Sequence, residues 1–519
     1  MLTNFLMTDA GGGRGVPGAD RCAPITIDQL ARHVNMSVEL RGWVYGRRSG
    51  GGIVFLLLRD GAGICQCVSE AADDDLFETA RHVPQESSVI VQGTVRRDPR
   101  APGGYELRLS RLVVIHAAEE YPIARKRHGI DFLLRHRHLW LRSPRQSILM
   151  RIRHTLVAAV RDFFNRRGFI LVDTPILSPG AAEGSATLFR VDYFGEEVYL
   201  AQTGQLYLEA ACMALGKVYC FGPTFRAEKS KTRRHLTEFW MVEPELAFAD
   251  LEQVMALAEE LVKHLVDRVL DRHAADLEFL GRKPETLSGV QGPFARISYT
   301  EAVDILHSGR LAAETEQFLA ARRAQLADRI RQLDEIEARI KGMQAGRRRD
   351  ALVAEAIGLR AEIRRLEEEV RNLPVHLQQA RRFAWGEDLG GDEETLLSRH
   401  FDRPVFITHY PRKCRAFYMK ADPGDPRLVL NFDLLAPEGY GEIVGGSQRE
   451  DDLSRLVERM QEEKMNLAPY QWYLDLRRYG SVTHGGFGLG IERFLSWLCG
   501  LDHVREAIAF PRMLGRINP

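Results

Sequence analysis

Two stretches far apart in the chain combine arginine with carboxylates in a way that suits phosphate chemistry. The first, "FRAEKSKTRRHLTEF" (225–239), places Arg226 and Glu228 two residues apart before a basic loop. Side chains alternate along a strand, so we expect both to lie on the same face of one strand. The second, "GLGIER", brings Arg493 just after a glycine-rich turn that would open a helix. Arginine forks and helix N-termini both favour anions, which predicts a phosphate-binding site.

Carboxylates that could hold a metal lie between the two stretches. In "NFDLLAPEGYGEIVGGSQRE" (431–450), Asp433 and Glu442 are candidate ligands for a hard divalent cation beside phosphates. Gly490, in the turn before Arg493, would let the backbone lie close to a flat ligand. A single Arg-Glu pair is most often a surface ion pair, and one glycine-rich turn is weak support for a nucleotide. The three elements in this order are hard to explain by structure alone.

Composition limits the classes of protein that remain. The 519 residues allow two or three domains, and 71 basic residues balance 71 acidic ones, so any anionic partner must be met by local basic patches. We find no apolar run of about 20 residues and no secretory signal, and predict no membrane segment. The seven cysteines have no zinc spacing and are expected as free thiols in the cytoplasm.

Residues 25–120 predict an OB-type β-barrel that follows a flexible tail at 1–24. Five β-rich runs are separated by turn residues, with one helical piece at 70–83 between the third and fourth runs. Cys65 and Cys67 would share one face of a strand. Such barrels bind oligonucleotides, although a purely structural barrel is the alternative.

The remainder predicts a hinge at 121–143 and a mixed α+β domain at 144–519. Apolar residues recur at helical spacing from Pro144, with Ser143 at the helix start, and a strand follows that ends near Pro175. Leucines seven apart at 352, 359, 366 and 373 predict an antiparallel coiled-coil hairpin at 312–380, with the break at "KGMQAG". Each arm would be on the order of 40 Å long.

These stretches together resemble the class II aminoacyl-tRNA synthetases. "FRAE…RHLTEF" is similar to their motif 2, "GFGLGIERFL" to motif 3, and the helix and strand ending at Pro175 to motif 1, which forms the dimer interface in that class. The barrel resembles the anticodon-binding domain of the aspartyl, asparaginyl and lysyl subgroup. The resemblance covers nearly the whole chain apart from the tail and the hairpin. It implies a catalytic domain built on an antiparallel sheet flanked by helices, and a homodimer through the motif 1 region.

The resemblance also implies an ATP and magnesium site. Arg226 would hold the α-phosphate and Arg493 the γ-phosphate, and these two with Glu442 would be the catalytic residues. Asp433 and Glu442 would bind Mg²⁺, although the gap between them is longer than in aspartyl enzymes. The other implied nucleotide-binding residues are Glu228, His235, Phe239, which would stack on adenine, and Gly490. An ordinary core aromatic is the alternative for Phe239.

Several stretches are similar to asparaginyl enzymes in particular, among them "TGQLYLEA", "EFWMVEPE" and "GEIVGGSQRE". Arg449 would donate to the side-chain oxygen of asparagine, and Glu243 would accept from its amide. Leu208 stands where aspartyl enzymes carry a lysine, and losing that cation suits a neutral amide. Glu183 and Gln205 would hold the substrate ammonium. A loop acid and a core salt bridge are the alternatives for Glu183 and Glu243.

In the barrel, Arg48, Phe55 and Gln66 match anticodon-binding residues of this subgroup, with a plain core role as the alternative for Phe55. The predicted function is therefore ATP-dependent attachment of asparagine to its tRNA through an asparaginyl-adenylate, releasing AMP and pyrophosphate. Three alternatives remain open at this point: an aspartate-specific or non-discriminating enzyme, a tRNA-independent amide-forming enzyme, and an inactive RNA-binding protein.

The hairpin departs from the family pattern. Its tip collects five basic residues and few acids, which suggests contact with tRNA or another macromolecule, while a solvated arm is the plainer alternative. The five are Arg339, Lys341, Arg347, Arg348 and Arg349.

Overall fold

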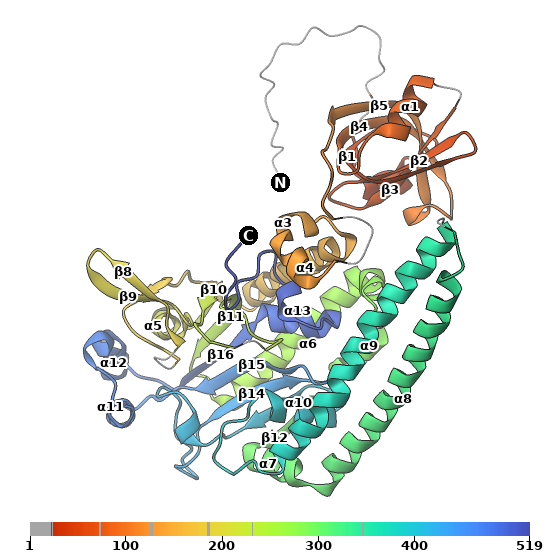
Figure 1. The fold of residues 1–519 in the computed structure, drawn as a ribbon. Helices are drawn as coiled ribbons and strands as arrows, with labels where there is room; N and C mark the ends of the chain where they lie inside the picture. The colour runs from red at the N-terminus through yellow and green to blue at the C-terminus, as the bar shows by residue number, and fades with distance from the viewer. Residues whose placement is uncertain are drawn as a thin grey trace, which may run out of the picture. The chain divides into compact units, whose positions relative to one another are not determined.

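A computed structural model describes residue 22 and residues 24–71, 74–123, 128–183, 187–230, 232–344 and 347–519. The tail predicted at 1–24 lies almost entirely outside these ranges, as does Lys231 of the basic loop. The chain divides into two compact units between residues 126 and 127, and each is described by itself (Figure 1). Within the described ranges, no helix is both long and apolar enough to cross a membrane.

The first unit is a closed barrel whose strands follow the order β1-β2-β3-β5-β4 (Figure 1). Along β2, Val54, Leu56 and Leu58 are fully buried, whereas Phe55 between them points to the outer side and is half-buried. Cys65 and Cys67 share the inner face of β3 as predicted, and the OB-type barrel is confirmed. The elements are β1 (Ser37–Gly50), β2 (Ile53–Arg59), β3 (Ile64–Glu70), α1 (Asp74–His82), β4 (Ser88–Arg97) and β5 (Tyr105–His116).

The second unit is built on an eight-stranded sheet in the order β12-β13-β14-β15-β16-β11-β10-β6. Neighbouring strands of this sheet are antiparallel except at its two edges, where β12 pairs with β13 and β6 pairs with β10 in parallel. A smaller sheet, β7-β9-β8, lies beside it. The strands are β6 (Ile170–Leu171), β7 (Leu177–Ser178), β8 (Arg190–Tyr193), β9 (Glu196–Leu200), β10 (Lys217–Phe225), β11 (Glu238–Ala247), β12 (Ala295–Ser298), β13 (Val405–Thr408), β14 (Asn431–Ala436), β15 (Gly441–Gln448) and β16 (His484–Gly490).

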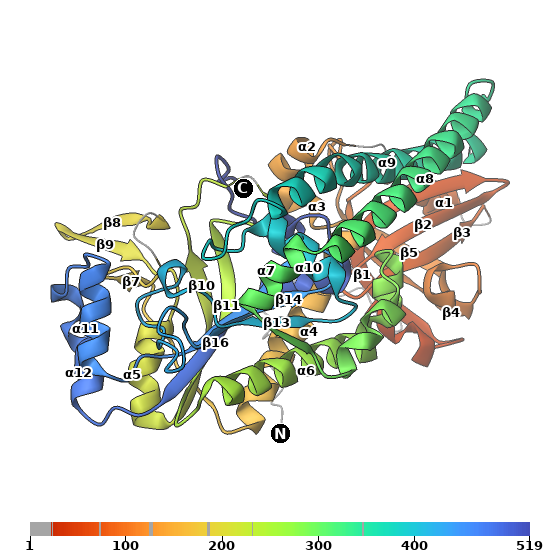
Figure 2. The ribbon, with the colours of Figure 1, turned by 90° about the horizontal axis from the view of Figure 1, so that it is seen from below.

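Two long helices, α4 (Pro144–Arg166) and α6 (Leu251–Phe279), cover one face of this sheet (Figure 2). Their apolar sides pack against strand residues such as Val242 and Phe487 in the largest core of the unit. The predicted start of α4 is confirmed, since the Ser143 hydroxyl accepts a hydrogen bond from the Gln146 backbone N–H. The other α-helices outside the hairpin are α2 (Ile130–Arg135), α3 (Arg137–Trp140), α5 (Gln205–Leu215), α7 (Tyr299–His307), α10 (Gly391–His400), α11 (Leu453–Glu462), α12 (Gln471–Arg478) and α13 (Ile491–Cys499).

Helices α8 (Gly309–Ile340) and α9 (Arg347–Ala380) form the predicted antiparallel hairpin, and both views show them side by side (Figures 1 and 2). The predicted heptad positions Leu352, Leu366 and Leu373 are buried. Ion pairs also cross between the helices, for example Arg329 with Glu362 at 3.0 Å. At 1.5 Å per residue, arms of 32 and 34 residues are about 50 Å long, which exceeds the predicted length.

Two strand predictions need correction. The strand expected to end near Pro175 stops at Leu171, because its pairing with β10 is limited to Ile170 and Leu171, with one further bond from the Val172 N–H to the Tyr219 carbonyl, and the chain resumes pairing only in β7. Strand β10 ends at Phe225, so Arg226 and Glu228 follow the strand and do not share one of its faces. The backbone leaves the ladder there, since the Ala227 N–H bonds to the Thr187 carbonyl.

The segment predicted as a hinge, 121–143, contains α2 and α3. Its C-terminal part is packed into the second unit. Arg137 is 1% exposed and donates to the backbone carbonyls of Ile508 and Ala509.

Candidate active site

Two hollows open next to each other on the sheet of the second unit, and Arg226, Met241, Glu442 and Gly488 line both. The first hollow contains the predicted nucleotide-binding residues except Asp433, and the second contains Asp433 and the predicted amino-acid-binding residues. The first is lined further by Glu228, Arg234, His235, Leu236, Phe239, Ile443, Gly490, Glu492, Arg493 and Val504. Lining side chains of the second include Glu183, Gln205, Leu208, Glu243, Glu245, Arg415, Tyr418, Asp433 and Arg449.

Strand β11 serves both hollows because alternate side chains of a strand share one face. Phe239 and Met241 face the first hollow, and Met241, Glu243 and Glu245 face the second. The position of Glu245, two residues after Glu243, is a signal in the sequence that could have marked it as a site residue. Phe239 is only half-buried and lines a hollow, so the alternative of an ordinary core aromatic is wrong.

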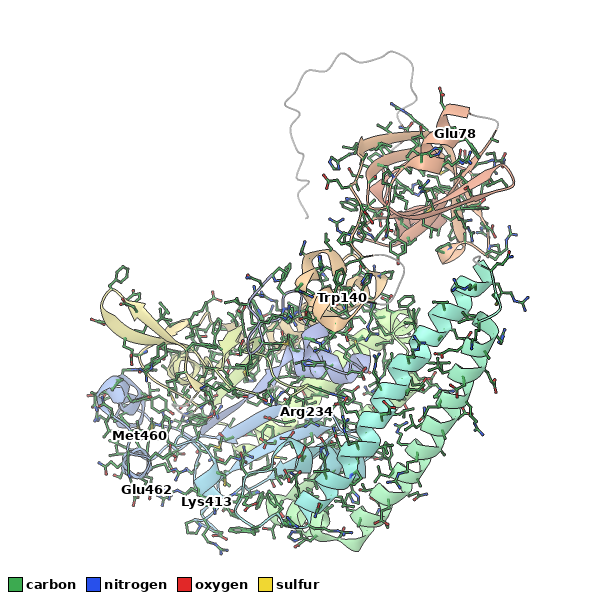
Figure 3. The ribbon with its side chains drawn as sticks, viewed as in Figure 1. Glu78, Trp140, Arg234, Lys413, Met460 and Glu462 are labelled. Atoms are coloured by element: carbon green, nitrogen blue, oxygen red, sulfur yellow. The ribbon has the colours of Figure 1, made fainter. Side chains whose placement is uncertain are left out.

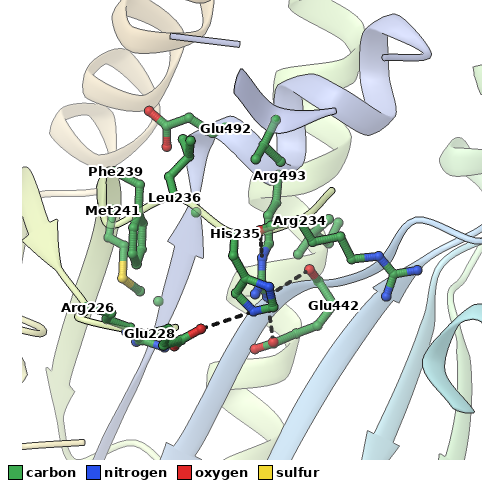
Figure 4. A pocket seen from close by; sticks show the side chains of 14 residues that line it. Arg226, Glu228, Arg234, His235, Leu236, Phe239, Met241, Glu442, Glu492 and Arg493 are labelled. Atoms are coloured by element: carbon green, nitrogen blue, oxygen red, sulfur yellow. Dashed lines mark hydrogen bonds and ion pairs between the residues drawn. The ribbon is translucent and has the colours of Figure 1, made fainter. Parts of the chain in front are cut away.

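The two arginines predicted from distant stretches converge in the first hollow (Figure 4). Arg493, near the start of α13, forms an ion pair with Glu442 at 2.8 Å. The guanidinium of Arg226 lies 5.5 Å from the centre of the Phe239 ring, and its buried Nε has no hydrogen-bond partner among the described residues. A buried donor of this kind without a partner is costly and points to a ligand that completes it.

The glycines of β16 have different surroundings. A Cβ on Gly486 or Gly488 would collide with Glu245 or Met241 of β11, so these two glycines allow the strands to pack. Gly490 lines the first hollow, and a Cβ there would meet nothing within 4 Å.

The basic loop between β10 and β11 is fixed to the rest of the site. Glu228 and His235 form a pair at 3.2 Å, and burial and the nearby Arg493 lower the pKa of His235. Arg234 lies in the middle of the unit (Figure 3), where it donates to Glu394 at 3.1 Å and to the Thr395 hydroxyl at 2.6 Å. The sequence offered no signal for this anchor, since the partners lie about 160 residues further along the chain.

Asp433 and Glu442 come close to each other on either side of Gly445. A Cβ built on Gly445 would lie 2.8 Å from a Glu442 oxygen and 3.5 Å from an Asp433 oxygen. The other oxygen of Asp433 accepts from Arg415 at 2.6 Å. Burial raises the pKa of Asp433 to about 7, with the acids Glu442 and Glu394 adding to the shift against Arg415. The described residues hold no group of three or more metal-binding side chains. Asp433 and Glu442 could therefore offer a metal ion two carboxylates and no third protein side chain of this kind.

The second hollow has a frame of buried charges and hydrogen bonds. Arg449 donates through Nε and Nη2 to both oxygens of Glu245, at 3.0 and 2.9 Å. Glu243 accepts from the Thr203 hydroxyl and from the Gly204 N–H at 2.9 Å, so its recorded partners are neutral and the core salt-bridge alternative is wrong.

Glu183 accepts from the Tyr418 hydroxyl and lines the second hollow, which fits a site acid better than a loop acid. Gln205 and Leu208, both on α5, also line this hollow as predicted.

Comparisons with known proteins agree with this geometry. The family described as tRNA synthetases class II (D, K and N) matches residues 129–514, and the OB-fold nucleic acid binding domain matches residues 38–115. The asparagine–tRNA ligase of Pelotomaculum thermopropionicum is 48% identical over 95% of this chain and 99% of its own length. The ligase of Thermus thermophilus is 50% identical over 95% of this chain and 100% of its own length. The chain belongs to the asparagine–tRNA ligases.

Solved structures of the family show the same fold. Asparaginyl-tRNA synthetase of Pyrococcus horikoshii, complexed with asparaginyl-adenylate, superposes with a TM-score of 0.78 at 42% identity and covers 95% of this chain and 99% of its own. The enzyme of Entamoeba histolytica, also with asparaginyl-adenylate, gives a TM-score of 0.76 at 28% identity, with 95% and 99% coverage. The predicted fold, family and class of ligase are thus confirmed.

The barrel of this asparagine–tRNA ligase groups the three residues predicted for the anticodon. The Arg48 guanidinium lies 4.5 Å over the Phe55 ring and donates to the Gln66 side-chain oxygen at 2.9 Å. Gln66 in turn donates to Glu106 at 3.0 Å. Phe55 is on the outer face and outside the barrel core, so the plain core role considered for it is wrong.

Proposed function

We propose that this chain attaches asparagine to its cognate tRNA in two steps at the joined hollows. In the first step, an oxygen of the asparagine carboxylate attacks the α-phosphorus of ATP in line, and pyrophosphate leaves. The carboxylate is already a nucleophile and needs no general base. In the second step, a terminal ribose hydroxyl of the tRNA attacks the carbonyl carbon of the adenylate, and AMP leaves. The convergence of Arg226, Arg493 and Glu442 carries this proposal.

The first hollow would bind ATP. Arg226 takes the α-phosphate, which the unpartnered Nε supports, and Arg493 takes the γ-phosphate. Phe239 stacks on adenine, and Glu228, His235 and Gly490 line the rest of the nucleotide. Preorganised cations beside developing negative charge are the main source of rate acceleration in phosphoryl chemistry.

Asp433 and Glu442 fit a magnesium ion. They offer hard carboxylate oxygens from one small area beside the first hollow, and the crowding of acids there, which helps to raise the pKa of Asp433, would be relieved by a cation. Two protein carboxylates are typical of Mg²⁺, which takes its other ligands from phosphate and water. When bound, the ion neutralises charge on the phosphates.

The second hollow would bind asparagine. Glu183 and Gln205 hold its ammonium, Glu243 accepts from its side-chain amide, and Arg449 donates to its side-chain oxygen. Leu208 offers no cation to a competing aspartate. An unpaired buried polar group costs about 1–3 kcal/mol, so a pocket of fixed donors and acceptors rejects the wrong side chain.

Three further assignments follow from the family. The barrel would bind the anticodon through Arg48, Phe55 and Gln66. A homodimer would form through the motif 1 region, where Ile170, Leu171, Ile176 and Leu177 are each 37–46% exposed and would be covered. The cytoplasm is the expected compartment.

The basic tip of the hairpin remains a prediction. Arg339, Lys341 and Arg348 are exposed there, while Arg347 has no described side chain. Deleting 326–366 across a short linker and measuring the apparent KM for tRNA tests the tRNA role, which an unchanged KM would exclude.

Pyrophosphate exchange with each amino acid tests the central proposal. We expect exchange that depends on asparagine, on ATP and on Mg²⁺, and aspartate at the same concentration should support little. A wild-type chain that exchanges with aspartate as well as with asparagine would contradict the assigned specificity, and a chain inactive with both would contradict the proposal as a whole.

A further inference from the structure

Behind the second hollow lies a fully buried network of polar side chains centred on Glu209. One oxygen of Glu209 accepts hydrogen bonds from Tyr473 and Arg477 at 2.7 Å each, and it also lies 3.1 Å from Nε2 of His484. The residues come from α5, α12 and β16, and Glu209, Tyr473 and His484 are all 0% exposed. Enclosing a carboxylate and a guanidinium in a protein core is costly, so a network of this kind calls for a purpose.

The second oxygen of Glu209 faces a residue of the hollow. It accepts from the side-chain nitrogen of Gln205 at 3.0 Å, one helical turn earlier on α5. Burial by itself would raise the pKa of Glu209, but Arg477 and His484 outweigh it and hold this pKa well below its ordinary value. Glu209 is therefore a carboxylate that can only accept hydrogen bonds.

An acceptor behind Gln205 decides which end of its amide faces the hollow. The amide has a donating NH2 end and an accepting oxygen end, and Glu209 can bond only to the NH2. The oxygen is left with no partner among the described residues, and Gln205 lines the hollow. A carbonyl oxygen presented there attracts a cationic group, whereas a flipped amide would present N–H groups and repel it.

We infer that Glu209 is a positioning residue, which locks the amide of Gln205 with its oxygen toward the ammonium of the bound amino acid. The inference rests on the proposed function, in which Gln205 holds that ammonium. Tyr473, Arg477 and His484 keep Glu209 in place from behind, and Glu209 itself does not touch the substrate.

A reciprocal exchange of the two side chains tests this inference. Glu209→Gln alone frees the amide of Gln205 to flip, and Gln205→Glu alone sets two carboxylates against each other. Each is expected to raise the KM for asparagine about tenfold or more in pyrophosphate exchange, with the KM for ATP nearly unchanged. The double variant Gln205→Glu/Glu209→Gln restores a donor behind and an acceptor in front, and should recover a KM within a few-fold of wild type.

Tyr473→Phe is the matched control, because it removes one hydrogen bond to Glu209 but leaves the contact with Gln205. Its KM for asparagine should change by no more than about twofold. If Tyr473→Phe raises the KM as much as Glu209→Gln does, or if the double variant binds asparagine no better than Gln205→Glu, then Glu209 acts only through packing and the inference is wrong. Should Glu209→Gln fail to fold, Gln205→Glu alone still decides, since an unchanged KM for asparagine in that variant would overturn the inference. Asparagine-dependent pyrophosphate exchange by the wild-type chain is measured in parallel. Its absence would contradict the proposed function, whereas its presence with unchanged variants would contradict only the role of Glu209.

Discussion

The two hollows differ in how their charges are held before any ligand binds. In the first, the side chains of Arg493 and Glu442 are 29% and 31% exposed, and those of His235 and Glu228 are similarly accessible. In the second, Arg449 and Glu245 are only 4% and 1% exposed. Exposed pairs contribute little and can exchange a partner for a ligand at small cost, whereas breaking a buried pair leaves an uncompensated charge.

This difference matches the ligand proposed for each hollow. A nucleotide brings several charges of its own, and groups that are loosely paired can turn toward them. An amide side chain brings no charge, so it must be distinguished by donors and acceptors that do not move. The first hollow is thus completed by its ligand, and the second is built in advance. The predictions below separate these two behaviours.

Removing a charge from the first hollow should destroy activity and leave the fold intact. Arg493→Ala is expected to lower kcat/KM for ATP in pyrophosphate exchange by about 10²–10³-fold, because one preorganised cation beside the phosphates is lost. Thermal unfolding should shift by no more than a few degrees, since the ion pair with Glu442 is partly exposed. Arg493→Lys is the control that keeps the charge, and it should recover part of the activity. A large loss of stability in Arg493→Ala would mean that the charged pairs of the two hollows contribute to the fold in the same way.

Removing a charge from the second hollow should instead destabilise the fold. Arg449→Met leaves Glu245 buried without its partner, and urea denaturation should show a loss of about 3–5 kcal/mol in the free energy of unfolding. Removing both members, with Arg449→Met/Glu245→Leu, should restore most of the stability but not the exchange with asparagine. If Arg449→Met alone is as stable as wild type, the second hollow is not the rigid frame that its burial indicates.

A change in the barrel should leave both hollows untouched. Phe55→Ala removes a stacking surface worth about 1–3 kcal/mol per base, so the KM for tRNA in aminoacylation should rise roughly tenfold. Pyrophosphate exchange without tRNA should keep its wild-type rate. Phe55→Tyr retains the ring and serves as the control. An equal effect of the two substitutions would exclude stacking as the role of Phe55.

The smallest expected effect is a pH dependence of stability on the side of the first hollow. His503 precedes Val504, and burial, with Arg505 and Arg233 nearby, lowers the pKa of His503 to about 3. Below about pH 6.5 the unfolded chain therefore binds a proton at His503 that the folded chain does not bind. This difference lowers the free energy of unfolding by up to about 1.4 kcal/mol per pH unit, or about 1–2 kcal/mol between pH 6.5 and 5.

His503→Asn should remove this slope, because asparagine can also accept the hydrogen bond that the Arg505 N–H donates. The informative window is pH 5 to 6.5, where Glu209 and the other carboxylates whose pKa is depressed are still ionised in both states. The prediction is contradicted if the free energies of unfolding of wild type and His503→Asn change with pH by the same amount across this window.

Sequence patterns were sufficient for elements that have a period or a motif of their own. The alternation of β2, the heptads of α9 and the helix start at Ser143 are local, and the structure has all three. Motif order was sufficient to bring Arg226, Arg493 and Glu442 together, because each motif fixes both an element and the residues at its end. The prediction failed where a strand ends, at Leu171 and Phe225, since those ends depend on which neighbour the backbone bonds to.

By itself, then, the sequence determined the family, the architecture and most of the residues around the two hollows. Only the tertiary structure decided how those residues are held. It showed the anchoring of Arg234 by Glu394, the pairing of Arg449 with Glu245, and the hydrogen bond from Gln205 to Glu209. The first two contacts join residues that are 160 or more positions apart, and even the Gln205–Glu209 pair depends on a network from α12 and β16. Spacing along the chain does not predict such partners, because the packing of whole elements against one another determines which residues meet.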